Sequence, residues 1–254
     1  MFSIGVRTIP AGSLQFVDFS KPDPAADRVQ RFMTAAQHAL AEGDAALAAQ
    51  RLVYARDAEA DNPAVLRLLT VAFWQARNLP AAARTVRDWA RLDTDRPTPE
   101  RFASRIYEDM GAFDLAAEAA ARAAARAPAD ASAWERLGRL RLRLMDRPGA
   151  IEALERARLV GPSVEGLLDL ALANHLAGDV GAEVSAAQAA TVIEPHSARA
   201  WSTYAHALAR TDRLAECERA CRRALSLESD AEVSELLGRV QAASPRGLSE
   251  RSAA

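Results

Sequence analysis

Apolar runs separated by short polar breaks extend over most of the chain, and small residues recur within these runs about every 34 residues. One column of small residues, interrupted only by Glu183, consists of Ala48, Ala82, Ala116, Ala150 and Cys217. A second column, twelve places upstream, contains Ala36, Thr70, Ser104, Gly138, Ala171 and Ala205. A third, seven places downstream, contains Ala123, Ala157, Ala190 and Ala224. The three columns predict stacked pairs of helices that cross closely at two points.

The polar breaks keep the same period and indicate where helices begin and end. Glycine ends a helix in the left-handed conformation, and Asp or Asn caps the helix that follows. The glycines at these breaks are Gly43, Gly111 and Gly178, and the candidate caps are Asp44, Asn78, Asp146, Asp179 and Asp212. Proline lacks an amide donor and clashes with the preceding turn, so prolines stop the second helix of a unit at Pro128, Pro162 and Pro195. Each unit is therefore predicted to be a helix, a tight turn and a helix.

With helices that begin and end at these positions, the sequence resembles the tetratricopeptide repeat family. The family's unit has Trp, Leu-Gly and an aromatic residue in its first helix, small residues in its second helix and a closing Pro. In residues 131–163 the matching positions are Trp134, Leu137, Gly138, Ala150, Leu154, Ala157 and Pro162. In residues 198–230 they are Trp201, Tyr204, Ala205, Leu208, Cys217, Cys221 and Ala224.

The resemblance implies an all-α fold, a right-handed α-α superhelical solenoid of helix-turn-helix repeats. We place the six units at 29–62, 63–96, 97–130, 131–163, 164–197 and 198–230, followed by a capping helix at 231–243. One two-helix unit cannot bury its apolar face alone, so stability must come from stacking. Residues 1–28 are predicted to be an extended leader, which either lies over the first helix or docks on a partner or in the protein's own groove. Residues 244–254 are predicted to be a disordered tail.

Composition narrows the class of protein. With 50% hydrophobic and 26% charged residues, the chain is not of the intrinsically disordered class. No apolar run approaches the roughly 18 residues of a membrane helix, and the start lacks the order of a secretory signal, so we expect a cytoplasmic location. Lys21 is the single lysine among 32 basic residues, and this arginine usage, together with abundant alanine, suggests a bacterial genome rich in GC. A net charge of −2 provides no general attraction for nucleic acid or anionic lipid.

Few residues form a pattern that supports catalysis or metal binding. Cys217 and Cys221 lie one helical turn apart and could offer two thiolates to a metal, but both occupy packing positions of the repeat, where free cysteine behaves as a small apolar residue. The histidines are isolated from one another, and the sequence has neither a glycine-rich phosphate loop nor a nucleophile elbow. We therefore expect no catalytic residue, no metal and no cofactor.

With catalysis and metal binding not expected, the remaining function is the binding of another molecule. In the tetratricopeptide repeat family the first helices of successive units line a concave groove, and this implies a ligand groove along the same helices here. The arginines placed there are Arg67, Arg101, Arg105, Arg139, Arg143 and Arg199, with Arg210 beside them. Guanidinium groups bind carboxylates in bidentate fashion, so this row suits an acidic ligand, unless the arginines pair with neighbouring acidic residues.

Apolar and histidine side chains accompany the arginines in the expected groove. They are Val71, Trp74, Leu168, Leu172, His175, Leu176 and His206. Leu168, Leu172 and Leu176 form a stripe along one helix face, and an exposed apolar stripe indicates a partner. A shift of one residue in the fifth unit would move Leu168 into the core.

We therefore predict a non-enzymatic scaffold or adaptor that binds an acidic or apolar partner peptide, or one that is both, in the concave groove. One alternative is an RNA-binding helical repeat, which the net charge disfavours and whose binding would weaken steeply with salt. A second is a helper subunit of an enzyme with a site around His175 and His206. A third is self-association into a homo-oligomer through an end helix or the leader. No membrane partner is expected.

Overall fold

The computed structural model describes residues 25–243, and the regular structure within this range is entirely α-helical. The thirteen helices are α1 (Ala25–Ala41), α2 (Ala45–Ala58), α3 (Pro63–Gln75), α4 (Leu79–Leu92), α5 (Thr98–Asp109), α6 (Phe113–Arg126), α7 (Ala131–Arg143), α8 (Arg147–Val160), α9 (Val164–Ala177), α10 (Val180–Ile193), α11 (Ala198–Leu208), α12 (Leu214–Leu227) and α13 (Ala231–Ala243).

The helices follow the predicted units, with one correction at the start of the chain. Each pair from α1 and α2 to α11 and α12 corresponds to one unit, and α13 occupies the range expected of the capping helix. Helix α1 begins at Ala25, so residues 25–28, which the sequence analysis placed in the leader, are helical. The rest of the expected leader and the expected tail at 244–254 lie outside the described residues.

The turn inside each of the first five units contains one residue with positive φ. Three of these residues are the expected glycines, Gly43, Gly111 and Gly178, with φ between 75° and 84°. In the second and fourth units the same position holds Arg77 and Met145, both with φ of 59°. A left-handed conformation costs a non-glycine residue about 1–2 kcal/mol, so the flanking helices must impose it at these two positions.

Most of the predicted caps are present. Asp44, Asn78, Asp146 and Asp179 each accept a backbone N–H of the following helix, at distances of 2.9 to 3.3 Å. Asp212 does not cap α12, whose N-cap is Arg213 without a side-chain hydrogen bond. The helix begins one residue later than the aspartate would require.

The small-residue columns lie where helices cross. Members of the first column, from Ala48 to Cys217, are fully buried. In the second column Gly138 faces Leu154 so closely that a Cβ atom would lie 2.5 Å from the Leu154 Cγ atom. Tightly packed interiors leave no room for an added methyl group at such a contact.

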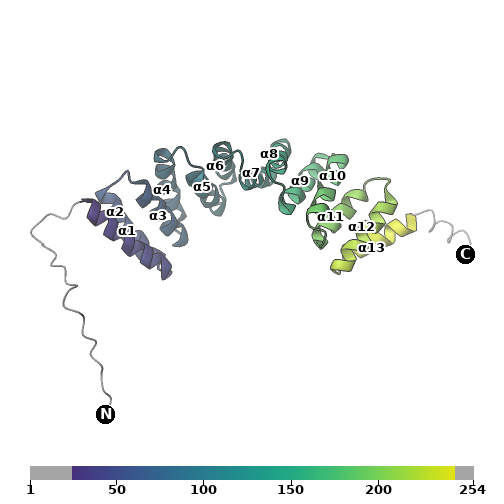
Figure 1. The fold of residues 1–254 in the computed structure, drawn as a ribbon, viewed down its shortest axis with the longest axis horizontal. Coiled ribbons are helices and arrows are strands. Elements are labelled where there is room, and N and C mark those ends of the chain that lie inside the picture. The colour runs from purple at the N-terminus through teal and green to yellow at the C-terminus, as the bar shows by residue number, and fades with distance from the viewer. Residues whose placement is uncertain (1–24, 244–254) are drawn as a thin grey trace, which may run out of the picture.

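The helix pairs stack into an arch in which odd-numbered helices form the inner side and even-numbered helices the outer side (Figure 1). Helix α1 contacts α3, and α7, α9, α11 and α13 contact one another in succession. The inner row is therefore the side on which neighbouring units approach most closely. It presents the first helix of every unit on one continuous face.

We predict opposite effects for the same substitution at two helical glycines. Gly138→Ala should lower the free energy of unfolding by about 1 kcal/mol or more, because Leu154 has to move in a packed core. Gly238→Ala should raise it by about 0.5–1 kcal/mol, because this exposed position of α13 has no heavy atom within 4 Å of the added Cβ and alanine favours the helix. Urea unfolding followed by circular dichroism measures both.

If the two substitutions changed the free energy of unfolding in the same direction, this result would contradict the packing described for the second column. The comparison is matched because both changes add one methyl group to a helix interior and gain the same helix propensity.

Candidate functional site

The residues that the sequence analysis placed in a groove lie on odd-numbered helices of the inner row, apart from Arg210, which lies in the connection between α11 and α12. Helix α3 carries Arg67, Val71 and Trp74; α5 carries Arg101 and Arg105; α7 carries Arg139 and Arg143; α9 carries Leu168, Leu172, His175 and Leu176; α11 carries Arg199 and His206. These residues differ in what they contact. Only part of the set forms a cavity.

A cavity of about 310 Å³ lies between α9 and α11 and brings together five of these residues. They are Leu168, Leu172, His175, Arg199 and His206, and the other lining residues are Asp169, Ala171, Glu183, Ser202 and Thr203. Leu176, which the sequence pattern placed in the same stripe, is half-buried and does not line this cavity.

The two leucines of the stripe that line the cavity differ in how exposed they are. Leu168 is 5% exposed and packs in a core cluster with Leu167 and Ala200, so it forms part of the cavity floor and not a free surface. Leu172 is 48% exposed and stands at the side of the opening. The cavity therefore offers an apolar surface with one readily accessible leucine, and Ser202 and His206 add groups that form hydrogen bonds.

Glu183 is the buried charged residue of the cavity that sequence reasoning did not assign to the site, although its break in the first small-residue column was a signal. Its side chain is 6% exposed and lines the cavity from α10. A guanidinium nitrogen of Arg210, Nη1, forms an ion pair with Glu183 Oε2, and His175 Nδ1 lies 3.0 Å from Glu183 Oε1. The carboxylate is thus compensated from two sides.

His175 lies between two charged groups, one of which accepts a hydrogen bond while the other donates one. Its Nδ1 atom lies 2.7 Å from Arg210 Nη1 as well as 3.0 Å from Glu183 Oε1. The nitrogen donates to Glu183 when it carries hydrogen and accepts from Arg210 when it does not, so it satisfies one partner at a time. The ion pair between Arg210 and Glu183 is the contact that persists in either case, and it joins the fifth and sixth units.

We predict that removing one member of this ion pair destabilises the protein more than removing the other. Arg210→Met should lower the free energy of unfolding by about 3 kcal/mol, because it leaves the buried Glu183 carboxylate without its cation. Glu183→Ala should cost less, because the Arg210 side chain is 35% exposed and can turn to water. Chemical denaturation of the two variants measures the difference.

Arg199→Met is the control for this comparison. Its partner Glu165 is 60% exposed, so losing the pair should change stability by less than about 1 kcal/mol. Equal losses for Arg210→Met and Arg199→Met would show that the burial of Glu183 has no energetic consequence.

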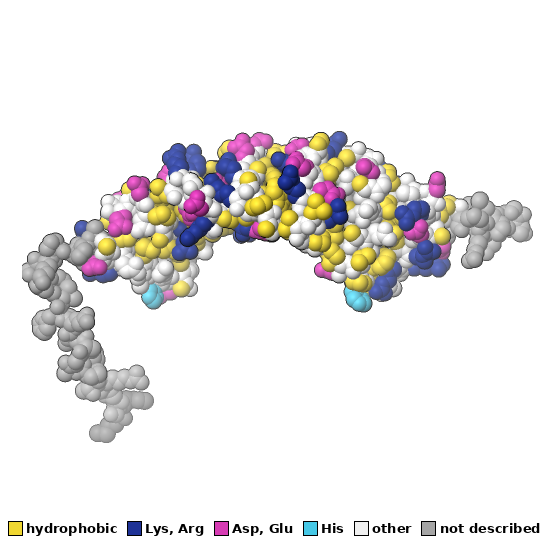
Figure 2. Space-filling model, turned by 45° about the horizontal axis from the view of Figure 1, so that its top comes forward, with side chains coloured by type: hydrophobic (Ala, Val, Ile, Leu, Met, Phe, Trp, Pro, Cys, Tyr) yellow, Lys and Arg dark blue, Asp and Glu magenta, His cyan; other side chains and the backbone are white. Residues whose placement is uncertain are grey.

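Most arginines of the expected groove are paired with acids of a neighbouring element. Arg139 Nε lies 3.0 Å from Asp169 Oδ2, and Arg199 Nη1 lies 2.8 Å from Glu165 Oε2. Arg143 Nη1 lies 3.8 Å from Glu108 Oε1, and Arg101 forms an ion pair with Asp130. The row of arginines is therefore largely neutralised. In Figure 2, where the top of the arch is turned forward, basic and acidic side chains are intermingled with hydrophobic ones on that side as well.

Two further side chains serve contacts between units that sequence reasoning did not assign. Arg136 donates to Glu108 at 2.7 Å and to the Ser104 hydroxyl at 2.8 Å, and burial lowers its pKa although Glu108 opposes this shift. Trp74 donates its indole N–H to Asp109 at 2.7 Å, so its polar edge is engaged within the protein. Within residues 25–243, Arg67 and Arg105 are the members of the predicted set of arginines without an ion pair or hydrogen bond.

No protein-family model and no curated protein matches the sequence. Solved structures do match the fold. The structure of YrrB, described as a tetratricopeptide repeat protein with an unusual peptide-binding site, aligns with 75% of this chain and 99% of its own at 15% identity and a TM-score of 0.63. A tetratricopeptide repeat protein from Parabacteroides merdae ATCC 43184 aligns with 85% of this chain and 86% of its own at 17% identity and a TM-score of 0.61.

MamA from Desulfovibrio magneticus RS-1 aligns with 66% of this chain and 96% of its own, at 19% identity and a TM-score of 0.58. Together with the helix pairs, these alignments decide the architecture. This chain has the tetratricopeptide repeat fold. At these identities the likeness concerns the fold, and the site has to be argued from the residues of this chain.

The two cysteines occupy packing positions of the tetratricopeptide repeat. Both are free and buried, and Cys217 Sγ lies 3.3 Å from the carbonyl oxygen of Ala205. Burial raises the pKa of Cys217, and it raises the pKa of Cys221 to about 12, with Cys217 adding to the shift. Residues 25–243 contain no cluster of His, Cys, Asp or Glu that could hold a metal ion.

We predict that both thiols react slowly in the native protein. At about pH 8 a maleimide should modify them at least about 100-fold more slowly than in the protein unfolded in urea, because burial excludes the reagent and suppresses the thiolate. Mass spectrometry of timed samples gives the two rates. Native modification within minutes would contradict the packing role.

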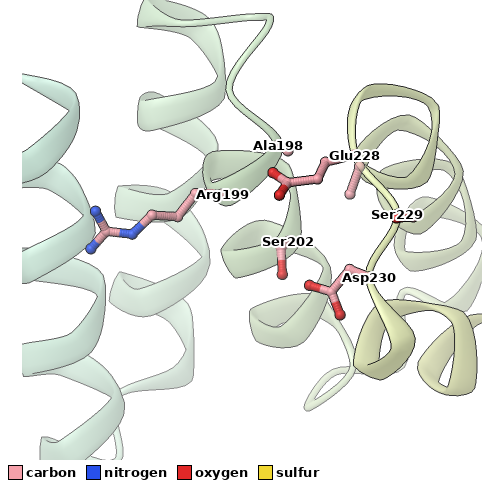
Figure 3. Close-up of a pocket in the computed structure, with 7 residues that line it drawn as sticks. Ala198, Arg199, Ser202, Glu228, Ser229 and Asp230 are labelled. Carbon is pink, nitrogen blue, oxygen red and sulfur yellow. The ribbon is translucent and has the colours of Figure 1, made fainter.

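A smaller cavity of about 210 Å³ lies at the end of the tetratricopeptide repeat array, between α11 and the α12–α13 connection. Figure 3 shows Glu228 and Asp230 facing α11, with Ser202 between them, while Arg199 extends away from both. Asp230 accepts the backbone N–H groups of Glu232 and Val233 at 2.8 and 3.1 Å, so it caps α13. One of the two acidic residues at this cavity, Asp230, therefore has a structural role.

None of the helices within residues 25–243 is long and apolar enough to cross a membrane.

Proposed function

We propose that this protein is a non-enzymatic scaffold or adaptor that binds a peptide segment of another protein on the inner face of its repeat array. The observation that carries the proposal is the cavity between α9 and α11, which places an accessible leucine beside polar groups on the inner row. The peptide-binding site named for YrrB, a protein of the same fold, supports the proposal.

The cavity favours a ligand with an apolar anchor side chain. Leu172 and the floor at Leu168 supply the apolar contact, and burying one aliphatic side chain there is worth about 1.5–3 kcal/mol. Ser202 and His206 line the same cavity and could bond to the ligand's backbone. A groove already formed in the free protein reduces the ordering cost of binding.

The inner face is less suited to RNA. Arg101, Arg139, Arg143 and Arg199 are each paired with an acidic residue, which removes much of the positive charge that a phosphate backbone would require. We propose a cytoplasmic, bacterial setting on the grounds of composition, and a second copy of the chain is one candidate partner.

The test is a selection of peptides from a random library on the immobilised protein, followed by affinity measurements on variants. Leu172→Glu should weaken the selected peptides by at least about tenfold, because it places a charge where the apolar anchor binds. Fluorescence polarisation with labelled peptides gives the dissociation constants. The substitution is at a half-exposed position, so the fold should persist.

Leu115→Glu is the matched control. Leu115 is 46% exposed on α6, a helix of the outer row, and it resembles Leu172 in exposure and in the change made. It should leave affinity within about twofold of the unmodified protein, a difference of under about 0.5 kcal/mol. A library that yields no binding peptide, or peptides that bind the Leu172→Glu variant equally well, would refute the proposed groove.

A further inference from the structure

Trp89 is the second large departure from the small-residue columns. It occupies the position of the third column in the second unit, is 2% exposed, and packs against Phe102 with ring centroids 5.7 Å apart. The connection that follows, from Asp93 to Pro97, is the longest between consecutive units in the described range. The second and third units therefore meet through a large ring and a long connection, at a place where other units have small residues and shorter connections.

A cavity of about 510 Å³ lies at this place, between the start of α3, the end of α4 and the start of α5. Trp89 and Thr98 both contribute to its lining, and Thr98 adds a hydroxyl group. Arg67 from α3 and Arg96 from the connection line the cavity as well. The cavity therefore combines a wide space with two guanidinium groups.

These two arginines differ from the paired arginines Arg101, Arg139, Arg143 and Arg199. Within residues 25–243 neither Arg67 nor Arg96 forms an ion pair or a hydrogen bond. One acidic residue, Asp93, lines the cavity, so two cations face one carboxylate. Arg105, also without a partner and exposed, lies on α5 and continues the excess of positive charge along the inner row.

We propose that the cavity between α3, α4 and α5 is a second subsite that binds a carboxylate side chain of an acidic peptide. The inference rests on the proposed function, since the same ligand would follow the inner face from one subsite to the other. Arg67 and Arg96 hold the carboxylate through charge-assisted hydrogen bonds, and Thr98 donates a further one. A cationic or apolar side chain gains nothing comparable there.

The repeat spacing sets the distance between the two subsites. Packed helices lie about 8–10 Å apart, so three repeat steps along the inner row place the subsites roughly 30 Å from each other. An extended chain covers about 3.3 Å per residue, so the acidic residue of the ligand lies about nine residues from its apolar anchor. This spacing excludes a single short motif that serves both subsites.

The experiment uses fluorescein-labelled octaglutamate as the probe and fluorescence polarisation as the readout, at about 50 mM salt, where ion pairs are weakly screened. Arg67→Glu with Arg96→Glu should weaken octaglutamate binding by at least about tenfold, and the double change to Gln should weaken it less. Amide shifts in NMR spectra of the labelled protein should change at Arg67, Arg96 and Thr98. Octalysine should not bind.

The charge-matched control is Arg84→Glu with Arg219→Glu. Both arginines are exposed on outer-row helices, α4 and α12, so this variant carries the same net charge while the cavity stays intact. It should bind octaglutamate within about twofold of the unmodified protein. A parallel loss in both variants would show binding to overall charge and would overturn the subsite.

Two other outcomes also overturn it. One is octaglutamate binding that survives the change to Glu at both cavity arginines. The other is an octauridine oligonucleotide that binds the cavity arginines more tightly than octaglutamate does, which would assign the cavity to RNA. Leu172→Glu, which tests the proposed function, should not affect octaglutamate binding, so the two hypotheses fail separately.

Discussion

The close approach of helices through small side chains is the constraint on which the rest of this structure depends. A two-helix unit exposes too much apolar surface to be stable alone, and its neighbours can cover that surface only if the backbones come close. The buried alanines at Ala48, Ala82, Ala116 and Ala150 permit this approach at equivalent places in successive units. The spacing of the inner row, and hence the geometry of any groove, follows from these contacts.

Much of the fold could be predicted because the constraint is local and periodic. Helix ends depend on capping residues and glycines within a few positions of the end, and these are visible in the sequence. Arg77 and Met145 could not be identified as left-handed residues in this way. Their conformation is imposed by the two helices that each turn connects, so only the period, which places them in line with Gly43, Gly111 and Gly178, indicates it.

The candidate site was predictable in its helices but not in its charge. The resemblance to the tetratricopeptide repeat family assigned the groove residues to the first helices of the units, whereas the partner of each arginine lies in another element, as Asp169 does for Arg139 and Glu165 for Arg199. Such pairs form across some 30 residues of sequence, and their existence depends on the exact turn between units. Sequence alone left open whether these arginines were free, and the structure separates Arg67 and Arg105 from the neutralised ones. Arg96, which sequence reasoning did not place in the groove, also has no partner within the described residues.

The two positions at which a small residue is replaced by a large one coincide with two cavities of the array. Glu183 replaces a member of the first column and lines the cavity between α9 and α11, and Trp89 replaces a member of the third and lines the cavity between α3, α4 and α5. A repeat packed through alanine alone has little space to offer a ligand, because the helices close over it. At these two positions a large side chain occupies the crossing that a small residue occupies in the other units. The two subsites proposed above lie at these departures from the packing pattern, and the unbroken units between them join the two cavities within one continuous array.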